Sequence, residues 1–235
     1  MEERAKKLEG VLLVDKPTGC TSFSLIAAAR RCCGVQTIGH AGTLDPLATG
    51  VVIVLVGRRY TRLSQLFLNR PKEYIARFHL GITTDTYDAD GQATGQSSKV
   101  PTDAEVQQAL GAFQGTIRQV PPMYSAKKVK GKKLYELARQ GVVIERAEVE
   151  VHVRTTLLDY SYPHLTIRLE CSKGTYVRSV AHDLGALLGC GAHVDQLQRT
   201  AVGQFHLRDC FPGIALNSGQ LDLSPHLITD PTRWS

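Results

Sequence analysis

The sequence predicts an α/β or α+β fold with a substantial sheet. Three patterns indicate this fold: an unbroken β-branched run at 51–56, alternating apolar residues at 74–80 and 165–171, and a helical apolar stripe within 176–188. A chain of 235 residues with 43% hydrophobic content buries a core without disulfides or metals. The length therefore suits one large domain or two small ones.

The first half of the chain alternates strand and helix signals. A β-rich run at 11–14 ends at the turn signal Lys16-Pro17-Thr18-Gly19, and a helix is expected over 22–31. The run 51–56 is typical of a strand covered on both faces, and it is far too short to span a bilayer. At 74–80, Tyr74 shares one face of a strand with the apolar residues that follow it. Sheet and helix are thus expected to be interleaved.

The second half continues the same mixture. Thr102-Asp103-Ala104-Glu105 is a capping box that opens a helix through about residue 113. A strand is expected at 165–171 and a helix at 176–188. After Phe211 the chain is irregular and rich in proline and glycine, with too few residues to form a domain of its own. We expect residues 211–235 to be a docked or frayed tail.

The net charge and the cysteine pattern indicate which classes of protein the sequence fits. The 28 basic residues exceed the 22 acidic residues to give a net charge of +6, which permits an anionic partner but does not demand one. The six cysteines show no zinc spacing and no legible disulfide framework. Residues 1–10 are too charged for a signal peptide. A cytoplasmic protein with reduced thiols and no metal site is therefore expected.

The stretch at 39–50 carries the most chemical information. By composition it is a loop, with three glycines and a proline, and it runs directly into the strand at 51–56. Loops held by a rigid strand are where catalytic groups are usually placed. Its lone acid is Asp45, and an Asp before Pro is, on physical grounds alone, often no more than a turn or cap residue.

Five blocks in order resemble the TruB class of pseudouridine synthases. They cover roughly residues 10 to 210: Gly39-His40-Ala41-Gly42-Thr43-Leu44-Asp45-Pro46-Leu47-Ala48-Thr49-Gly50; Lys72-Glu73-Tyr74 with residues 80–91; Pro121-Pro122-Met123-Tyr124-Ser125-Ala126-Lys127 with Gly131, Tyr135, Glu136 and Ala138-Arg139; Gly174-Thr175-Tyr176-Val177-Arg178-Ser179; and residues 191–194 with Leu197, Arg199-Thr200 and Gly203. The resemblance implies a mixed, mainly antiparallel sheet flanked by helices and the isomerisation of uridine to pseudouridine. It assigns the nucleophile to Asp45.

The resemblance also implies partners for Asp45. Arg178 would pair with the carboxylate, because a planar guanidinium stays charged in a dry pocket; the alternative is a surface arginine at the start of its helix. Tyr74 would stack on the target uracil and take the C5 proton, unless it is only a core tyrosine. Whether Asp45 attacks C1′ of the ribose or C6 of the base stays open. No metal or organic cofactor is expected.

Further residues are expected to meet RNA. Tyr176 and Leu197 would line the pocket, although core packing explains both nearly as well. His40 would fill space left by flipped bases, its alternative being a solvated loop histidine. The lysines Lys127, Lys128, Lys130, Lys132 and Lys133 would gather phosphates, although such a run is usually only a solvated face. Arg58, Arg59 and Arg62 would extend that surface.

Two departures from the family pattern stand out. Gln198 replaces the first of two consecutive arginines that members often carry after the pocket leucine. Many members also have a C-terminal RNA-binding domain of the PUA type, for which residues 211–235 leave no room. We expect a catalytic domain at 1–210 and a short tail without a PUA domain at 211–235. The chain is expected to act as a monomer, without a protein partner or a membrane, on uridine 55 of the T-arm stem-loop of free tRNA.

Three rival functions fit part of this pattern. A related synthase with another RNA or with guide-RNA partners shares the chemistry. An RNA chaperone that opens the T-arm without catalysis predicts that Asp45 is dispensable. A hydrolase of small nucleosides explains Asp45 but gives the lysines nothing to bind.

Overall fold

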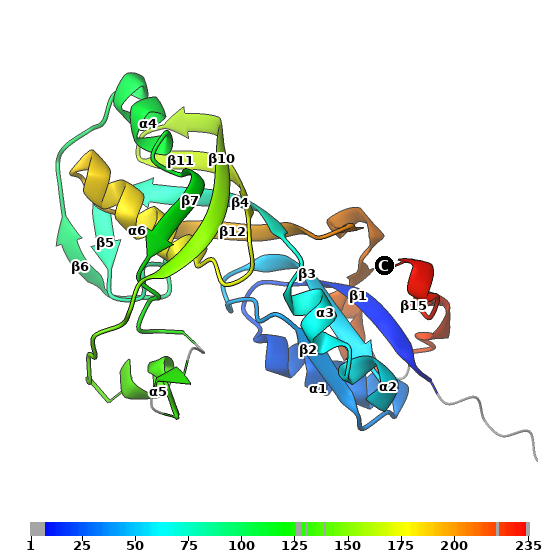
Figure 1. Ribbon diagram of the computed structural model, residues 1–235. Coiled ribbons are helices and arrows are strands. Elements are labelled where there is room, and N and C mark those ends of the chain that lie inside the picture. The colour runs from blue at the N-terminus through cyan, green and yellow to red at the C-terminus, as the bar shows by residue number, and fades with distance from the viewer. Residues whose placement is uncertain (1–7, 126–127, 130, 139, 220, 234–235) are drawn as a thin grey trace, which may run out of the picture. The chain divides into compact units, whose positions relative to one another are not determined.

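The computed structural model describes residues 8–125, 128–129, 131–138, 140–219 and 221–233 (Figure 1). These residues belong to two compact units. The terminal unit comprises residues 1–72 and 198–235, so it joins the two ends of the chain, and the central unit comprises residues 73–197. Strand β12 (Ala192–Val202) contributes residues to both units.

The terminal unit is built on a pair of antiparallel strands. β1 (Gly10–Lys16) runs along the whole of β3 (Thr49–Val56), with Gly10 opposite Val56 and Lys16 opposite Gly50 (Figure 1). Every residue of β3 after Thr49 is buried, as expected for a strand covered on both faces. Shorter strands complete the sheet: β2 (Ile38–Ala41) pairs with β3, β14 (Phe211–Pro212) and β15 (Leu227–Ile228) pair with β1, and β13 (Phe205–His206) pairs with β12.

Helices cover this sheet and bury its apolar residues. α1 (Ser22–Cys33) begins at the N-cap Thr21, whose hydroxyl accepts from the Ser24 amide, and it ends at the left-handed Gly34. α2 (Arg58–Thr61) and α3 (Ser64–Leu68) pack against β2. Short 3₁₀ turns occupy 207–209, 213–217, 224–226 and 231–233. The segment after Phe211 therefore lies on β1 and beside α1 within the terminal unit.

The central unit contains the longer antiparallel strands. Its sheet has the order β12-β4-β11-β10-β7, formed by β4 (Lys72–Leu80), β7 (Gln114–Gln119), β10 (Val149–Ser161) and β11 (His164–Cys171). α4 (Asp103–Leu110) packs against α6 (Val177–Leu188) and β10. Two small hairpins stand apart from this sheet, β5 (Ile82–Thr84) with β6 (Ala93–Gln96) and β8 (Lys128–Val129) with β9 (Lys132–Lys133). The short helix α5 (Leu134–Ala138) follows β9.

Most of the predicted elements are confirmed. The mixed, mainly antiparallel sheet flanked by helices is present, and on β4 the alternating residues Tyr74, Ala76, Phe78 and Leu80 are buried. The capping box of α4 forms as predicted, with Thr102 and Glu105 exchanging hydrogen bonds, but the helix ends at Leu110 and not near residue 113. No helix in the described ranges has the length and apolar character of a membrane span.

The prediction that all of 39–50 is a loop is wrong at both ends. Gly39, His40 and Ala41 lie on β2, and Thr49 and Gly50 open β3. Composition suggested a loop because glycines are frequent there, yet pairing of β2 with β3 satisfies the backbone of these residues. Only Gly42 to Ala48 connect the two strands. We call these seven residues the Asp45 loop.

Gly50 tests the packing that anchors the Asp45 loop. It adopts φ +105°, and a Cβ atom there would lie 2.2 Å from the Arg199 carbonyl oxygen on the paired strand β12. We expect Gly50→Ala to lower the free energy of unfolding by about 3 kcal/mol or more, through strain and forced strand separation. The control Gly19→Ala, with φ +76° and no atom within 4 Å, should cost only about 1–2 kcal/mol. Equal costs in urea denaturation would contradict the packing argument.

Candidate active site

The Asp45 loop is a tight connection with its own internal turn. The Ala48 amide donates to the Asp45 carbonyl oxygen at 3.1 Å, and the Asp45 residue is half-buried. On either side, Leu44 and Ala48 are buried and fasten the loop into the core. The loop is therefore held by its neighbours and projects a single acidic side chain.

A buried lysine holds one side of the loop. Lys16, the last residue of β1, is 0% exposed, and its ammonium donates to the carbonyl oxygens of Pro17 at 2.9 Å, Cys20 at 2.8 Å and Pro46 at 3.2 Å. Three carbonyls match the three protons of an ammonium. Burial lowers the pKa of Lys16, while the nearby Cys20 and Asp45 act in the opposite direction. Lys16 therefore interacts electrostatically with the acid of the loop and also binds the residue next to it.

A buried arginine holds the other side. Arg199, on β12, is 1% exposed, and its guanidinium donates to the carbonyl oxygens of Val51 at 2.6 Å, Thr43 at 3.4 Å and Gly42 at 3.3 Å. Its fork thus spans the start of the loop and the strand that follows it.

Hydroxyl groups complete the attachment. Ser22, at the start of α1, donates to the Leu44 carbonyl oxygen at 3.2 Å and accepts from the Leu44 amide at 2.9 Å. The Thr18 hydroxyl donates to the Leu47 carbonyl oxygen at 3.0 Å. Sequence reasoning read Lys16 and Thr18 only as turn residues and missed this role. The signal available was a lysine at the end of a strand whose first five residues are glycine and aliphatic residues.

His40 lies beside the loop, in surroundings that disfavour its charged form. It lies on β2 opposite Val54 and is partly buried. Burial lowers the pKa of His40, and the charge of Arg199 lowers it further, against a backbone hydrogen bond at Gly42. Burial therefore favours the uncharged ring of His40. Its expected contact with RNA stays a prediction.

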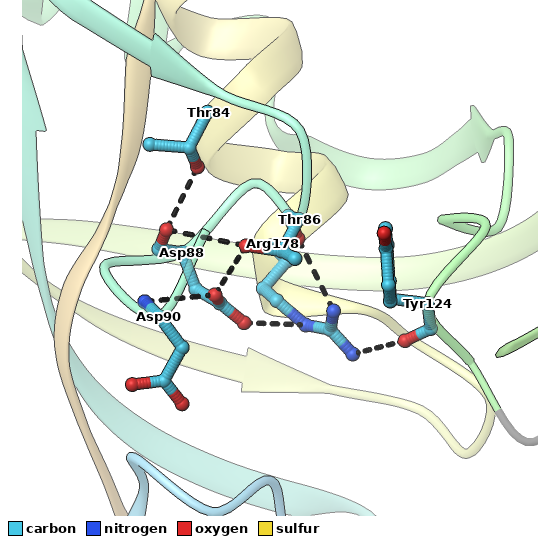
Figure 2. A network of polar contacts seen from close by, with 6 residues as sticks. All are labelled: Thr84, Thr86, Asp88, Asp90, Tyr124 and Arg178. Atoms are coloured by element: carbon cyan, nitrogen blue, oxygen red, sulfur yellow. Dashed lines mark hydrogen bonds and ion pairs between the residues drawn. The ribbon is translucent and has the colours of Figure 1, made fainter. Parts of the chain in front are cut away.

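In the central unit, Arg178 lies in a cage of acceptors (Figure 2). It is the second residue of α6 and is 5% exposed, so the alternative of a surface arginine is wrong. Its Nε lies 3.5 Å from Oδ2 of Asp88, and its other nitrogens donate to the carbonyl oxygens of Thr86 at 3.2 Å and Tyr124 at 2.9 Å. Asp88 is itself 5% exposed, which makes this a buried ion pair.

The segment 84–90 is shaped around the Asp88 carboxylate. The Thr86 hydroxyl at 2.5 Å and the Asp90 amide at 3.2 Å both donate to Oδ1, and the Thr84 hydroxyl donates to the Asp88 carbonyl oxygen at 2.7 Å (Figure 2). Between them, Tyr87 adopts φ +64° and stacks on His182 with ring centroids 4.0 Å apart. This segment belongs to the blocks that resemble the family, but the sequence alone assigns Asp88 no role.

The remaining predicted residues lie in the central unit as follows. Tyr74 is 8% exposed on β4, and Leu197 is 6% exposed on β12. Tyr176 is the N-cap residue of α6, and its amide donates to Oε1 of Gln119 at 2.7 Å. Asp45 belongs to the terminal unit, so its predicted pairing with Arg178 and Tyr74 stays a prediction.

The lysine cluster is described only in part. Lys128 pairs with Lys133 across the β8–β9 hairpin, and Lys132 lies beside them on β9. Lys127 and Lys130 lie outside the described residues. Elsewhere in the described ranges, no three His, Cys, Asp or Glu side chains are grouped to hold a metal ion.

Comparisons with known proteins agree on one family. The model of the TruB family pseudouridylate synthase N-terminal domain matches residues 30–177, and that of the tRNA pseudouridylate synthase B C-terminal domain matches residues 178–218. A protein named tRNA pseudouridine synthase B from Protochlamydia amoebophila (strain UWE25) is 57% identical over 211 residues, covering 90% of this chain and 80% of that protein. Its namesake from Chlamydia muridarum (strain MoPn / Nigg) is 56% identical over 227 residues, covering 97% and 94%.

Solved structures show the same fold. In a crystal structure of a Cbf5-Nop10-Gar1 complex, the matching chain has a TM-score of 0.68 and 29% identity. The match covers 86% of this chain and 52% of that chain, so this chain spans about half the length of that neighbour.

Lys16→Met tests the attachment of the Asp45 loop. Removing the ammonium takes a donor from the Pro46 carbonyl oxygen, which still accepts from the Gly19 amide at 2.9 Å, and the loop should therefore open more often. We expect hydrogen exchange of the Leu44 and Ala48 amides to accelerate about tenfold or more, which corresponds to about 1.4 kcal/mol of local stability. The control Thr18→Val removes an exposed hydroxyl from the same loop and should change exchange far less. Unchanged exchange in Lys16→Met would show that the lysine does not hold the loop.

Arg178→Lys tests the cage around the guanidinium. An ammonium on a flexible stem cannot reach Asp88, Thr86 and Tyr124 together, so we expect a loss of about 2–4 kcal/mol in the free energy of unfolding. The matched control Arg168→Lys affects an exposed arginine 4.0 Å from Glu73 and should cost less than about 0.5 kcal/mol. Urea titration measures both. If the two losses agree, the cage does not depend on the planar fork.

Proposed function

This chain belongs to the TruB family of pseudouridylate synthases, and we propose that it uses Asp45 as the nucleophile of a tRNA pseudouridine synthase. The isomerase activity on uridine 55 follows from family membership at 56–57% identity over 90% or more of the chain. The assignment of Asp45 rests on a single observation. Asp45 is the sole acid of the Asp45 loop, and two fully buried cations hold the backbone on either side of it.

The reaction requires one well-placed carboxylate. The bond between ribose C1′ and uracil N1 breaks, the base turns, and C1′ joins C5. The uridine must first leave its stack, because atoms inside a folded loop cannot be reached. A carboxylate then stabilises or captures the electron-poor carbon, as in retaining glycosidases, or adds to the base. Uridine and pseudouridine are isomers, so the reaction needs no external donor or acceptor of atoms or electrons.

The surroundings of Asp45 support this role. A nucleophilic carboxylate must be ionised, and nearby cations stabilise its charge. The Lys16 ammonium is close enough for the charge of Asp45 to influence it. We propose that Arg178 adds a second cation in the working enzyme. The buried pair with Asp88 keeps the Arg178 side chain in one conformation for that purpose.

The other predicted residues are proposed to handle the base. Tyr74 stacks on the uracil and its hydroxyl takes the C5 proton late in the reaction. Tyr176 and Leu197 line the pocket, and His40 fills space vacated by flipped bases. His40 suits that role because burial lowers its pKa and so favours the uncharged ring.

The substrate is proposed to be the T-arm stem-loop of tRNA, bound in the cytoplasm by a monomer without protein partners. Residues 1–210 would form the catalytic domain, and residues 211–235 would form a tail docked on β1. The β8–β9 hairpin would contact phosphates of the tRNA. The solved neighbour is a complex of Cbf5, Nop10 and Gar1. We propose that this chain needs no such subunits, as its high identity is to proteins named tRNA pseudouridine synthase B.

Asp45→Asn tests the nucleophile directly. The amide keeps the size of the side chain but cannot attack, so turnover should fall roughly ten-thousandfold or more while tRNA binding and folding stay nearly intact. Release of tritium from C5-labelled uridine in tRNA measures the rate. The exposed Asp209→Asn is the matched control and should keep the parental rate. Activity of Asp45→Asn within tenfold of the parent would reject Asp45 as the nucleophile, whereas a parental protein that binds tRNA but releases no tritium would favour the chaperone.

A further inference from the structure

Three arginines project from one short helix of the terminal unit. Arg58 and Arg59 lie on α2 and Arg62 follows its last residue, and all three are exposed. They are separate in sequence from the lysines of the β8–β9 hairpin. We call Arg58, Arg59 and Arg62 the α2 arginines.

The helix that carries them is firmly anchored. Tyr60, between the arginines, is 4% exposed, and its hydroxyl donates to the Thr229 carbonyl oxygen at 3.4 Å. The Gly57 amide donates to the Thr37 carbonyl oxygen at 2.8 Å, and the Thr61 hydroxyl to that of Arg58 at 3.1 Å. The α2 arginines thus project from a fixed backbone, which lowers the entropy cost of binding a partner.

Among the described residues, the α2 arginines differ from the exposed arginines of the central unit in their acidic partners. Exposed arginines of the central unit face carboxylates: Arg118 faces Glu150 at 3.4 Å, Arg154 faces Glu170 at 4.0 Å, and Arg168 faces Glu73 at 4.0 Å. For the α2 arginines, no ion pair with an acidic residue is found in the part of the chain that the structure describes. Arg59 instead lies 5.9 Å from the ring centroid of Tyr60. The Glu9 side chain lies beside Gly57, so three guanidinium groups stand near one described carboxylate, and this excess of positive charge attracts anions.

The length of β3 separates these arginines from the Asp45 loop. The loop leads into Thr49 at one end of the strand, and α2 begins two residues after Val56 at the other. Eight residues at about 3.3 Å each give a separation of roughly 25 Å. A nucleotide at Asp45 is therefore out of reach of the α2 arginines, whereas a double helix that continues from its loop along β3 would span this distance.

We propose that the α2 arginines bind backbone phosphates of the base-paired stem that carries the target loop. The proposal rests on the proposed function, because it takes the target nucleotide to lie at Asp45. Guanidinium groups bind phosphate oxygens in bidentate fashion, and proteins recognise RNA double helices through backbone and shape. The contact gives affinity that is independent of stem sequence and falls with salt.

The test compares two triple variants with the same loss of charge. One carries Arg58→Gln, Arg59→Gln and Arg62→Gln, and the control carries Arg118→Gln, Arg154→Gln and Arg168→Gln, whose arginines face glutamates. Binding of a T-arm hairpin is measured from low to high salt. The first variant should reduce the magnitude of the log–log salt slope by roughly 2 to 3, at about 0.7–0.9 per phosphate contact, and the control by much less.

A second hairpin locates the contact. Its stem is shortened so that the paired region ends well within about 25 Å of the target, and on it the first variant should bind like the parent. Three results would each overturn the proposal. The parent and the first variant could have equal salt slopes, the two triple variants could lose equal amounts of slope, or the first variant could lose as much slope on the short hairpin as on the long one. Pseudouridine formation by the parent on the long hairpin is followed in parallel. Its absence would count against the proposed function, whereas an unchanged slope counts against the α2 arginines alone.

Discussion

Two cations without solvent contact determine where the acid of the Asp45 loop lies. Lys16 and Arg199 are 0% and 1% exposed, and between them they donate to backbone carbonyls before, within and after the loop. Burying a charge without partners is costly, so each cation requires its acceptors where they are. The requirement is mutual, because the loop has no regular secondary structure to bind its own carbonyls. The position of the loop thus depends on β1 and β12, which are distant in sequence.

A loop held in this way suits a nucleophile. Catalytic groups must keep their geometry to within a fraction of an ångström, and a displacement of about 1 Å can cost a hundredfold in rate. The Asp45 loop obtains that rigidity from hydrogen bonds to buried donors and from Gly50, where β12 approaches too closely for any side chain. In the central unit, Asp88 does the same for Arg178: a buried carboxylate, itself held by Thr86 and the Asp90 amide, keeps the guanidinium in one conformation.

Local patterns were sufficient to predict much of the fold. Each of three predicted features depends only on residues that are close in sequence, and all three are present: the alternation of β4, the apolar stripe of α6 and the capping box of α4. The residues that position the site were not predictable in this way. Lys16 reads as part of a turn because the acceptor that links it to the Asp45 loop, the Pro46 carbonyl oxygen, lies 30 positions away. Asp88 reads as one of several acids because folding alone brings Arg178 close to it. Long-range partners of polar groups leave no periodicity in the sequence.

The central claim is that this chain converts a uridine of tRNA into pseudouridine at the Asp45 loop. The most direct measurement is mass-resolved mapping of pseudouridine, after a label specific for that base, in unmodified tRNA incubated with the purified protein. The account predicts one labelled position, the uridine numbered 55 in the T-arm loop, at a yield that rises with time. Label at a different position, or none in tRNA that the protein binds, would contradict it.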